Sequence, residues 1–275
     1  MTIFFHPNIK QKGALSTVDE AILSARLLRR NMDPWYPMAL YANAAALELA
    51  QQKTDISSHW DVVQQPSIPT PKDGQAISLA LTIRDAGNRS SAYAFKLQAL
   101  VQSPFTRTLF LDNDIFVLDA TLVHGFLSQI LMLADVAGPV DPTHAFHRLD
   151  RKIQSHTPML STCLFAFRNT KQVRGYLLAA WKRFLLGGTD LRGHLYGGRR
   201  GFRRGDQEAL FLEWTHGKHK LRVLPLPQRN YCPKVTLDAG LLRATWWTGR
   251  YQHQPCRALH GHSYHGTIRK YLEKR

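Results

Sequence analysis

The stretch Thr108-Leu109-Phe110-Leu111-Asp112-Asn113-Asp114-Ile115-Phe116-Val117-Leu118 decides how the rest of the sequence is interpreted. Two apolar runs of strand length flank a pair of aspartates that are one residue apart, Asp112 and Asp114. Carboxylates inside so apolar a segment cost several kcal/mol if they are buried without a partner. A divalent cation, which binds oxygen ligands, would compensate them. The pair therefore indicates a site.

Strand and helix signals alternate ahead of the aspartates. Apolar runs at 2–5 and 38–41 are expected strands, and helical spacing follows each of them, from Thr17 and in an Ala-rich segment through about Gln51. A further helix at 90–101 leads into the aspartate strand. This β-α-β-α order predicts an α/β protein with a mostly parallel sheet and helices on both faces. Ligands of such sheets bind beyond the carboxyl ends of the strands, where the aspartates would stand.

The alternation continues after the aspartates. The sequence predicts an apolar helix at 121–134, strands at 135–138, 160–167 and 221–224, an amphipathic helix from Val173 and a short helix opened by Asp206-Gln207. Residues 187–205 break this periodicity and are rich in Gly and Arg, which predicts a basic loop. We find no internal repeat and no linker that would divide the chain.

The composition describes a globular, basic chain. It has 275 residues, of which 44% are hydrophobic, enough to bury a substantial core. Lys and Arg number 36 against 20 Asp and Glu, a formal net charge of +16, which predicts affinity for polyanions, anionic membranes or phosphorylated ligands. Three cysteines suit a reducing compartment, although Cys232 and Cys256 could pair. With no membrane-spanning apolar run and no signal-peptide pattern, we expect a soluble, cytoplasmic protein.

Three kinds of protein carry aspartates at this spacing. A calcium loop needs an oxygen ligand in place of Phe116 and a glycine in place of Val117, so that interpretation fails. A phosphatase of the haloacid-dehalogenase type would have Thr or Val at Phe116 and would usually carry the pair on its first strand. The D-x-D of nucleotide-sugar glycosyltransferases, whose carboxylates hold a divalent metal against the donor diphosphate, fits the apolar strand and its position. A surface turn is disfavoured by the apolar flanks.

Further segments extend the D-x-D pattern in chain order. They are Lys96-Leu97-Gln98-Ala99-Leu100, Ser103-Pro104-Phe105, Phe165-Ala166-Phe167-Arg168-Asn169-Thr170, Gly205-Asp206-Gln207, Leu224-Pro225-Leu226-Pro227 with Asn230, and Ala258-Leu259-His260-Gly261. Together with the aspartates, they resemble glycogenin-like (family 8) and related retaining glycosyltransferases of the GT-A fold. Ser161-Thr162-Cys163 stands where such families often carry an Asn-x-Gly turn, and the terminal His-x-x-Gly-x-x-Lys pattern fits loosely.

The resemblance implies a single GT-A (Rossmann-like) domain over residues 1–275, with a nucleotide-binding half at 1–114 and an acceptor and metal-completing half at 115–275. It implies transfer of a sugar, with retention, from a nucleotide-diphosphate sugar to a hydroxyl of a glycan, protein or lipid-linked acceptor. UDP-sugar is the expected donor, and Mn²⁺ or Mg²⁺ the expected cofactor. Front-face displacement, with the acceptor proton passing to the departing phosphate, is the implied mechanism.

The resemblance also implies roles for single residues. Asp114 would ligate the metal, Asp112 would contact the metal or the ribose, and His260 would be the third protein ligand. Two oxygens and an imidazole suit manganese, with diphosphate oxygens completing an octahedron. Asp206 and Gln207 would lie near the transferred sugar as catalytic residues. The residues expected on the donor are Lys96, Asp112, Asn113, Gly261 and His262.

Several of these residues also have a structural interpretation. Asp206 could cap its helix, and Lys96 could be a solvated helix lysine. His262 and His265 are rival ligands, and with Cys256 and His260 they could instead form a zinc site. The loop at 187–205 could close over the donor, hold an acidic acceptor or simply be solvated.

Other classes of function remain open at this stage. One is a metal-dependent phosphohydrolase, and another is an inactive transferase-like scaffold. A third, a basic nucleic-acid-binding protein, is suggested by the charge and by six tryptophans. Aspartates would repel nucleic-acid phosphate unless a metal were present, so nucleic acid is the disfavoured partner. Peripheral contact with an anionic membrane is compatible with the charge.

Overall fold

The computed structural model describes residues 2–5, 17–32, 35–42, 44–65, 88–119, 121–140, 159–185, 206–227, 235–237, 244–248, 251–255, 257–260 and 265–273. The predicted basic loop at 187–205 lies outside these residues.

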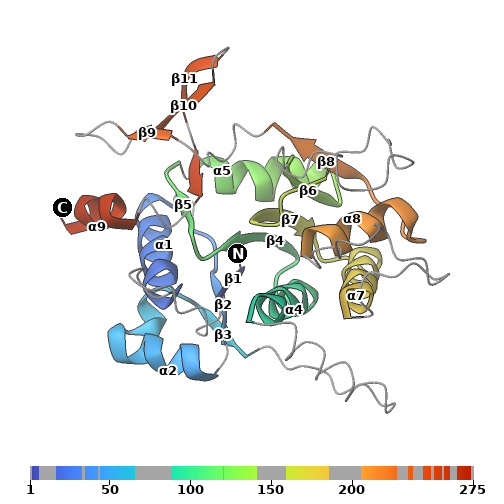
Figure 1. The fold of residues 1–275 in the computed structure, drawn as a ribbon, viewed down its shortest axis with the longest axis horizontal. Helices are drawn as coiled ribbons and strands as arrows, with labels where there is room; N and C mark the ends of the chain where they lie inside the picture. The colour runs from blue at the N-terminus through green and yellow to red at the C-terminus, as the bar shows by residue number, and fades with distance from the viewer. Residues whose placement is uncertain are drawn as a thin grey trace, which may run out of the picture.

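The larger sheet of the described chain has the strand order β3-β2-β1-β4-β7-β6-β8 (Figure 1). Its strands are β1 (Thr2–Phe5), β2 (Ala39–Ala42), β3 (Val62–Gln64), β4 (Arg107–Asp112), β6 (Val136–Pro139), β7 (Leu164–Arg168) and β8 (Val223–Leu226). The pairs β1-β2, β2-β3, β1-β4 and β6-β8 are parallel, whereas β7 is antiparallel to both β4 and β6. The mostly parallel sheet expected from the sequence is confirmed.

The strand order changes direction between β1 and β4. From β1 the chain adds β2 and β3 on one side, and it then returns to place β4 on the other side. The register pairs Phe4 with Asp112, so both strands end at the same edge. This boundary is the topological switch point at which open α/β sheets bind ligands. Asp112, the last residue of β4, stands there.

Helices cover both faces of this sheet. They are α1 (Thr17–Asn31), α2 (Ala44–Lys53), α4 (Asn88–Val101), α5 (Thr121–His124), the π-helical η2 (Gly125–Ile130), α6 (Leu131–Leu133), α7 (Lys171–Leu185) and α8 (Asp206–His216). A further helix, α9 (His265–Glu273), packs against α1 (Figure 1). Leu109 and Leu111 face the core under α1 and α5, and Phe110 faces the core under α4, α7 and α8. This alternation follows from the period of two along a strand and buries β4 on both faces.

A second, two-stranded sheet joins the segment just after the aspartates to the C-terminal region. β5 (Ile115–Val117) pairs antiparallel with β12 (Ala258–His260). Ser24 of α1 donates its hydroxyl to the carbonyl of Ile115 at 2.6 Å, which fixes β5 on α1. A separate antiparallel sheet consists of β9 (Val235–Leu237), β10 (Ala244–Thr248) and β11 (Tyr251–Pro255).

The expected elements differ from the observed ones mainly at their ends. The strand expected at 160–167 begins at Leu164, and the one expected at 221–224 is β8, from Val223 to Leu226. The apolar helix expected at 121–134 is one helical stretch with a π-helical middle. The elements without a predicted counterpart include β3, β9, β10, β11, β12 and α9. None of the described helices combines the length and hydropathy that a bilayer span requires.

The position of β4 predicts a large cost for removing its central ring. Phe110 is 0% exposed, and Phe110→Ala leaves a cavity between β4 and α4. We expect urea denaturation to show a loss of about 3–5 kcal/mol. Leu178→Ala, at a position 37% exposed on α7, is the matched control and should change stability by less than about 0.5 kcal/mol. Equal losses in the two variants would contradict the assignment of β4 to the core.

Candidate active site

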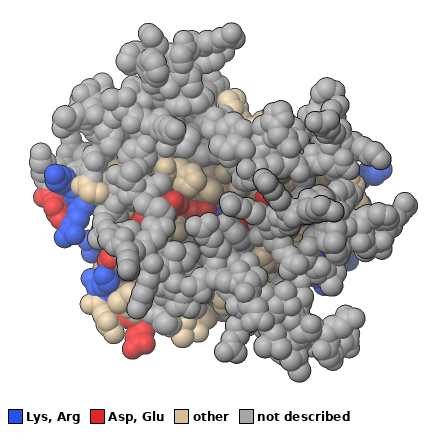
Figure 2. Space-filling model, in the orientation of Figure 1, with Lys and Arg blue, Asp and Glu red and all other residues tan. Residues whose placement is uncertain are grey.

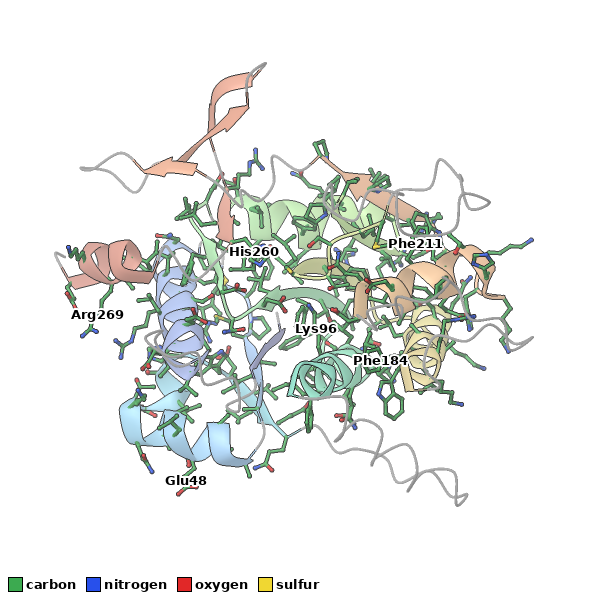
Figure 3. All side chains as sticks on the ribbon, in the orientation of Figure 1. Glu48, Lys96, Phe184, Phe211, His260 and Arg269 are labelled. Carbon is green, nitrogen blue, oxygen red and sulfur yellow. The ribbon has the colours of Figure 1, made fainter. Side chains whose placement is uncertain are left out.

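Lys96 is the side chain around which the candidate site is built. It lies on α4, is 5% exposed, and points to the carboxyl end of β4 (Figure 3). Its ammonium nitrogen is 2.9 Å from Asp112 Oδ1 and 2.9 Å from Asp206 Oδ2. It also donates to Thr162 Oγ1 at 3.1 Å, and the Thr162 hydroxyl in turn donates to Asp206. Residues from α4, β4, α8 and the turn before β7 thus meet in one hydrogen-bonded cluster.

The charges in this cluster depend on one another. Burial opposes the charged form of Lys96, but the neighbouring carboxylates of Asp112 and Asp206 outweigh burial and hold the pKa of the amine above its ordinary value. Burial raises the pKa of Asp112; Lys96 opposes this rise, while Asp114 and Asp206 add to it. Three carboxylates, those of Asp112, Asp114 and Asp206, therefore lie close enough to influence one another, and the Lys96 ammonium pairs with only two of them. The net negative charge favours a further cation.

Asp114 meets His260 across the smaller sheet. Pairing of β5 with β12 places His260 opposite Ile115, the residue after Asp114. His260 Nε2 is 3.5 Å from Asp114 Oδ2, and the two side chains are 27% and 14% exposed. The sequence separates these residues widely, and the β5-β12 pairing brings them together.

The donors at this position fit a divalent cation. Two ligands on adjacent corners of an octahedron with bonds of about 2.1 Å lie about 3 Å apart, close to the observed separation of Asp114 and His260. Asp112 lies beside them but is engaged by Lys96. Within the described part of the chain, no group of three His, Cys, Asp or Glu side chains is already arranged around a common metal position. Asp114 and His260 are thus the best-placed protein ligands.

The middle residue of the D-x-D is held by α1. Asn113 donates its amide to Glu20 Oε2 at 2.9 Å, and Glu20 is 1% exposed. Ser24, one turn later on the same helix face, bonds the carbonyl of Ile115. Asn31, near the end of that helix, donates to the carbonyl of Val117 at 3.3 Å. One polar face of α1 therefore fixes the turn and the strand that carry Asp114.

The other predicted residues are placed as follows. Asp206 is the first residue of α8, and its carboxylate contacts Lys96 and Thr162 rather than serving only the helix end. Gln207 follows it and donates to the carbonyl of Leu160 at 3.3 Å. Gly261 and His262 lie outside the described residues, as do Cys256 and the side chain of His265. The predicted donor contacts of Lys96, Asp112 and Asn113 stay predictions.

Three contributors were not predicted from the sequence. Glu20 follows Thr17 at capping-box spacing, which by itself predicts only the start of a helix, yet Glu20 accepts a hydrogen bond from Asn113. Thr162 and Cys163 were noted only as a departure from an Asn-x-Gly turn. The carbonyl of Cys163 accepts from the Asp112 amide at 2.9 Å, and burial raises the pKa of its thiol, which is therefore neutral. That departure from the family pattern was the available signal.

Comparison with known proteins identifies the fold. No family model matches the sequence, and no curated protein matches it. A structure of the galactosyltransferase LgtC with donor and acceptor sugar analogs matches with a TM-score of 0.59 at 12% identity, over 98% of this chain and 95% of that one. The chain has a GT-A fold.

Two further glycosyltransferases share this GT-A fold. The apo form of mouse xyloside xylosyltransferase 1 matches with a TM-score of 0.53 at 11% identity, over 94% of this chain and 96% of that one. The bifunctional glycosyltransferase WbbM matches with a TM-score of 0.50 at 13% identity, over 84% of this chain and 39% of that one. At these identities the likeness concerns the fold, so the chemistry must be argued from the residues of this chain.

Replacing Lys96 tests the cluster directly. Lys96→Met leaves Asp112 and Asp206 close together without their shared cation, and breaking a buried ion pair in this way typically costs about 3–5 kcal/mol. Chemical denaturation should show a loss of that size. Asp206→Asn in the same chain should restore part of it, because one of the two uncompensated charges is removed.

Lys182→Met is the matched control for this experiment, because Lys182 is an exposed lysine on α7. It should change stability by less than about 0.5 kcal/mol. A Lys96→Met protein as stable as the control, or no recovery in the double variant, would show that the cluster is not held by Lys96.

Proposed function

We propose that the chain is a metal-dependent glycosyltransferase that moves a sugar from a nucleotide-diphosphate sugar to a hydroxyl acceptor. The observation that carries this proposal is the joining of Asp114 with His260 beside the Lys96 cluster, at the switch point of a GT-A fold. Both carboxylates of the D-x-D are thereby placed where open α/β sheets bind nucleotides. The solved structures with a similar fold are glycosyltransferases, which supports sugar transfer as the reaction of this chain.

Charge neutralisation is the main demand of this reaction. When a nucleoside diphosphate departs from a sugar, negative charge develops on the leaving group and positive charge on the sugar ring. Asp114 and His260 would hold Mn²⁺ or Mg²⁺, which would supply positive charge to the diphosphate. Asp112 would contact the same cation or the ribose.

The Lys96 cluster would serve the sugar side of the reaction. Lys96 is bonded to two carboxylates, so we assign it first the positioning of Asp112 and Asp206 and only second the neutralisation of phosphate. The Asp206 carboxylate, oriented by Lys96 and Thr162, would support the positive charge on the ring. Gln207, beside it on α8, would contact the transferred sugar. Retention by front-face displacement is carried over from the family resemblance.

The family resemblance supplies the proposed domain, donor and acceptor. A single domain would comprise a nucleotide-binding half at 1–114 and an acceptor and metal-completing half at 115–275. The donor would be a UDP-sugar, held also by Asn113, Gly261 and His262. The acceptor would be a glycan, a protein or a lipid-linked sugar.

Asp114→Asn and His260→Ala test the proposed reaction. Purified protein is screened by thermal shift against UDP- and GDP-sugars with and without Mn²⁺, and hydrolysis of the best donor is then measured. Both variants should lower turnover at least about a hundredfold, because the metal supplies several kcal/mol of transition-state stabilisation. Asp119→Asn, at a carboxylate 39% exposed just beyond β5, is the matched control and should retain activity.

Two results would overturn the proposal. One is the lack of any metal-dependent thermal shift with every nucleotide sugar. The other is release of phosphate from simple phosphoesters at a comparable rate without a nucleotide sugar, which would identify a phosphohydrolase.

The contact of Glu20 with Asn113 predicts a role for α1 in metal affinity. Glu20→Ala frees the turn that carries Asp114, and loss of such an outer partner typically weakens metal binding about 10- to 100-fold. Calorimetric titration with Mn²⁺ measures the change. Glu48→Ala, at an exposed glutamate on α2 (Figure 3), removes the same charge from the surface and should bind Mn²⁺ as the wild type does. Equal affinity in both variants would leave Glu20 without this role.

A further inference from the structure

The edge of the sheet opposite the candidate site carries a concentration of positive charge. Parallel strands β4, β6 and β8 begin at this amino edge, and antiparallel β7 ends there. Exposed basic side chains belong to these strand ends and to the segments beside them. We call them the amino-edge patch: Arg107, Lys171, Arg174, Lys218, Lys220 and Arg222.

Hydrogen bonds join the segments that carry the amino-edge patch. Asn169, just after β7, donates to the carbonyls of Ser103 and Phe105, just before β4, at 2.9 and 3.0 Å. Arg174 donates to the Asn169 side chain at 2.5 Å. The amide of Gln172 at the start of α7 donates to the carbonyl of Lys220 ahead of β8. Segments far apart in sequence are therefore joined side by side.

Little negative charge opposes the patch. Seven Lys and Arg residues but only one carboxylate, Asp135, occur in the described segments 104–107, 132–135, 168–174 and 217–222. Asp135 is 17% exposed and is paired with Arg222 at 3.2 Å. Because its charge is already matched, the other basic side chains give this edge a positive potential.

Two large aliphatic side chains adjoin this charge. Met132 and Leu133, at the end of α6 directly before β6, are 59% and 73% exposed. The Arg107 guanidinium lies 3.5 Å from the sulfur of Met132, so the apolar pair borders the patch. Exposed aliphatic side chains beside Lys and Arg are typical of proteins that rest on a membrane interface.

We propose that the amino-edge patch docks the protein on an anionic phospholipid surface, with Met132 and Leu133 inserted at the interface. Lys and Arg would face the lipid phosphates, and the aliphatic pair would reach the acyl boundary. A nucleic acid would gain less here, because single strands are bound by stacking on aromatic rings and Met132 and Leu133 are aliphatic. The six-residue β4 would hold the active site roughly 17 Å from the docked edge, facing away from the bilayer.

Vesicle co-sedimentation at low ionic strength tests this docking. The full chain is mixed with vesicles of phosphatidylcholine alone or of phosphatidylcholine and phosphatidylglycerol in a two-to-one ratio. Binding should require the anionic lipid, and Lys218→Gln with Lys220→Gln should weaken it by more than about tenfold, at about fivefold per basic residue. The matched double variant, Lys182→Gln with Lys270→Gln, removes one exposed charge from α7 and one from α9. Helix α9 lies on the far side of the molecule (Figure 1).

The aliphatic contribution is tested by Leu133→Ser, with Leu178→Ser on α7 as control. Only the first should weaken vesicle binding, and neither should change binding to a single-stranded oligonucleotide measured by anisotropy. Equal loss in both lysine double variants would reduce the effect to net charge and overturn the proposal. So would tight oligonucleotide binding with Leu133→Ser vesicle binding unchanged, or no preference for the anionic vesicles. These binding measurements use neither donor nor metal, so their outcome does not depend on the proposed transferase activity.

Discussion

The site depends on the buried contact of the Lys96 ammonium with the carboxylates of Asp112 and Asp206. A lysine so deeply buried is costly unless it is paired, and each carboxylate is costly without the lysine. The contact therefore fixes the position of α8 relative to α4 and β4. It leaves the charge of Asp114 to be compensated by another group.

In a protein of formal net charge +16, carboxylates gather near the middle of one face (Figure 2). Such a concentration is expected where a cation is to be bound.

Chain topology supplies the remaining parts of the site. The switch in strand order brings β4 beside β1, and the return of the chain as β12 brings His260 to Asp114. α1 adds a polar face that holds Asn113 and β5 in place. The two edges of the sheet thus differ in charge: the carboxyl edge gathers carboxylates, and the amino edge gathers Lys and Arg. The length of the strands separates these two edges.

Much of the fold could be predicted from the sequence because β4 is buried on both faces and bounded by clear helices. Lys96, Asp112 and Asp206 belong to segments that follow one another in the same order as in the family that the sequence resembles. That order allowed them to be predicted as parts of one site. Glu20 and Thr162 escaped prediction because nothing local distinguishes a buried glutamate on α1 from a helix-capping one, or a bridging threonine from a turn residue. The antiparallel direction of β7 likewise depends on long-range pairing with β4 and β6, which periodicity does not encode.

The proposed function rests on a divalent cation shared by Asp114 and His260. Electron spin-echo spectroscopy of the Mn²⁺-loaded protein with UDP tests it without relying on catalysis. We predict a nitrogen coupling from a directly bound imidazole that disappears in His260→Gln while the other histidines remain. A bound Mn²⁺ without nitrogen coupling, or a coupling that persists in His260→Gln, would contradict a cation shared by Asp114 and His260.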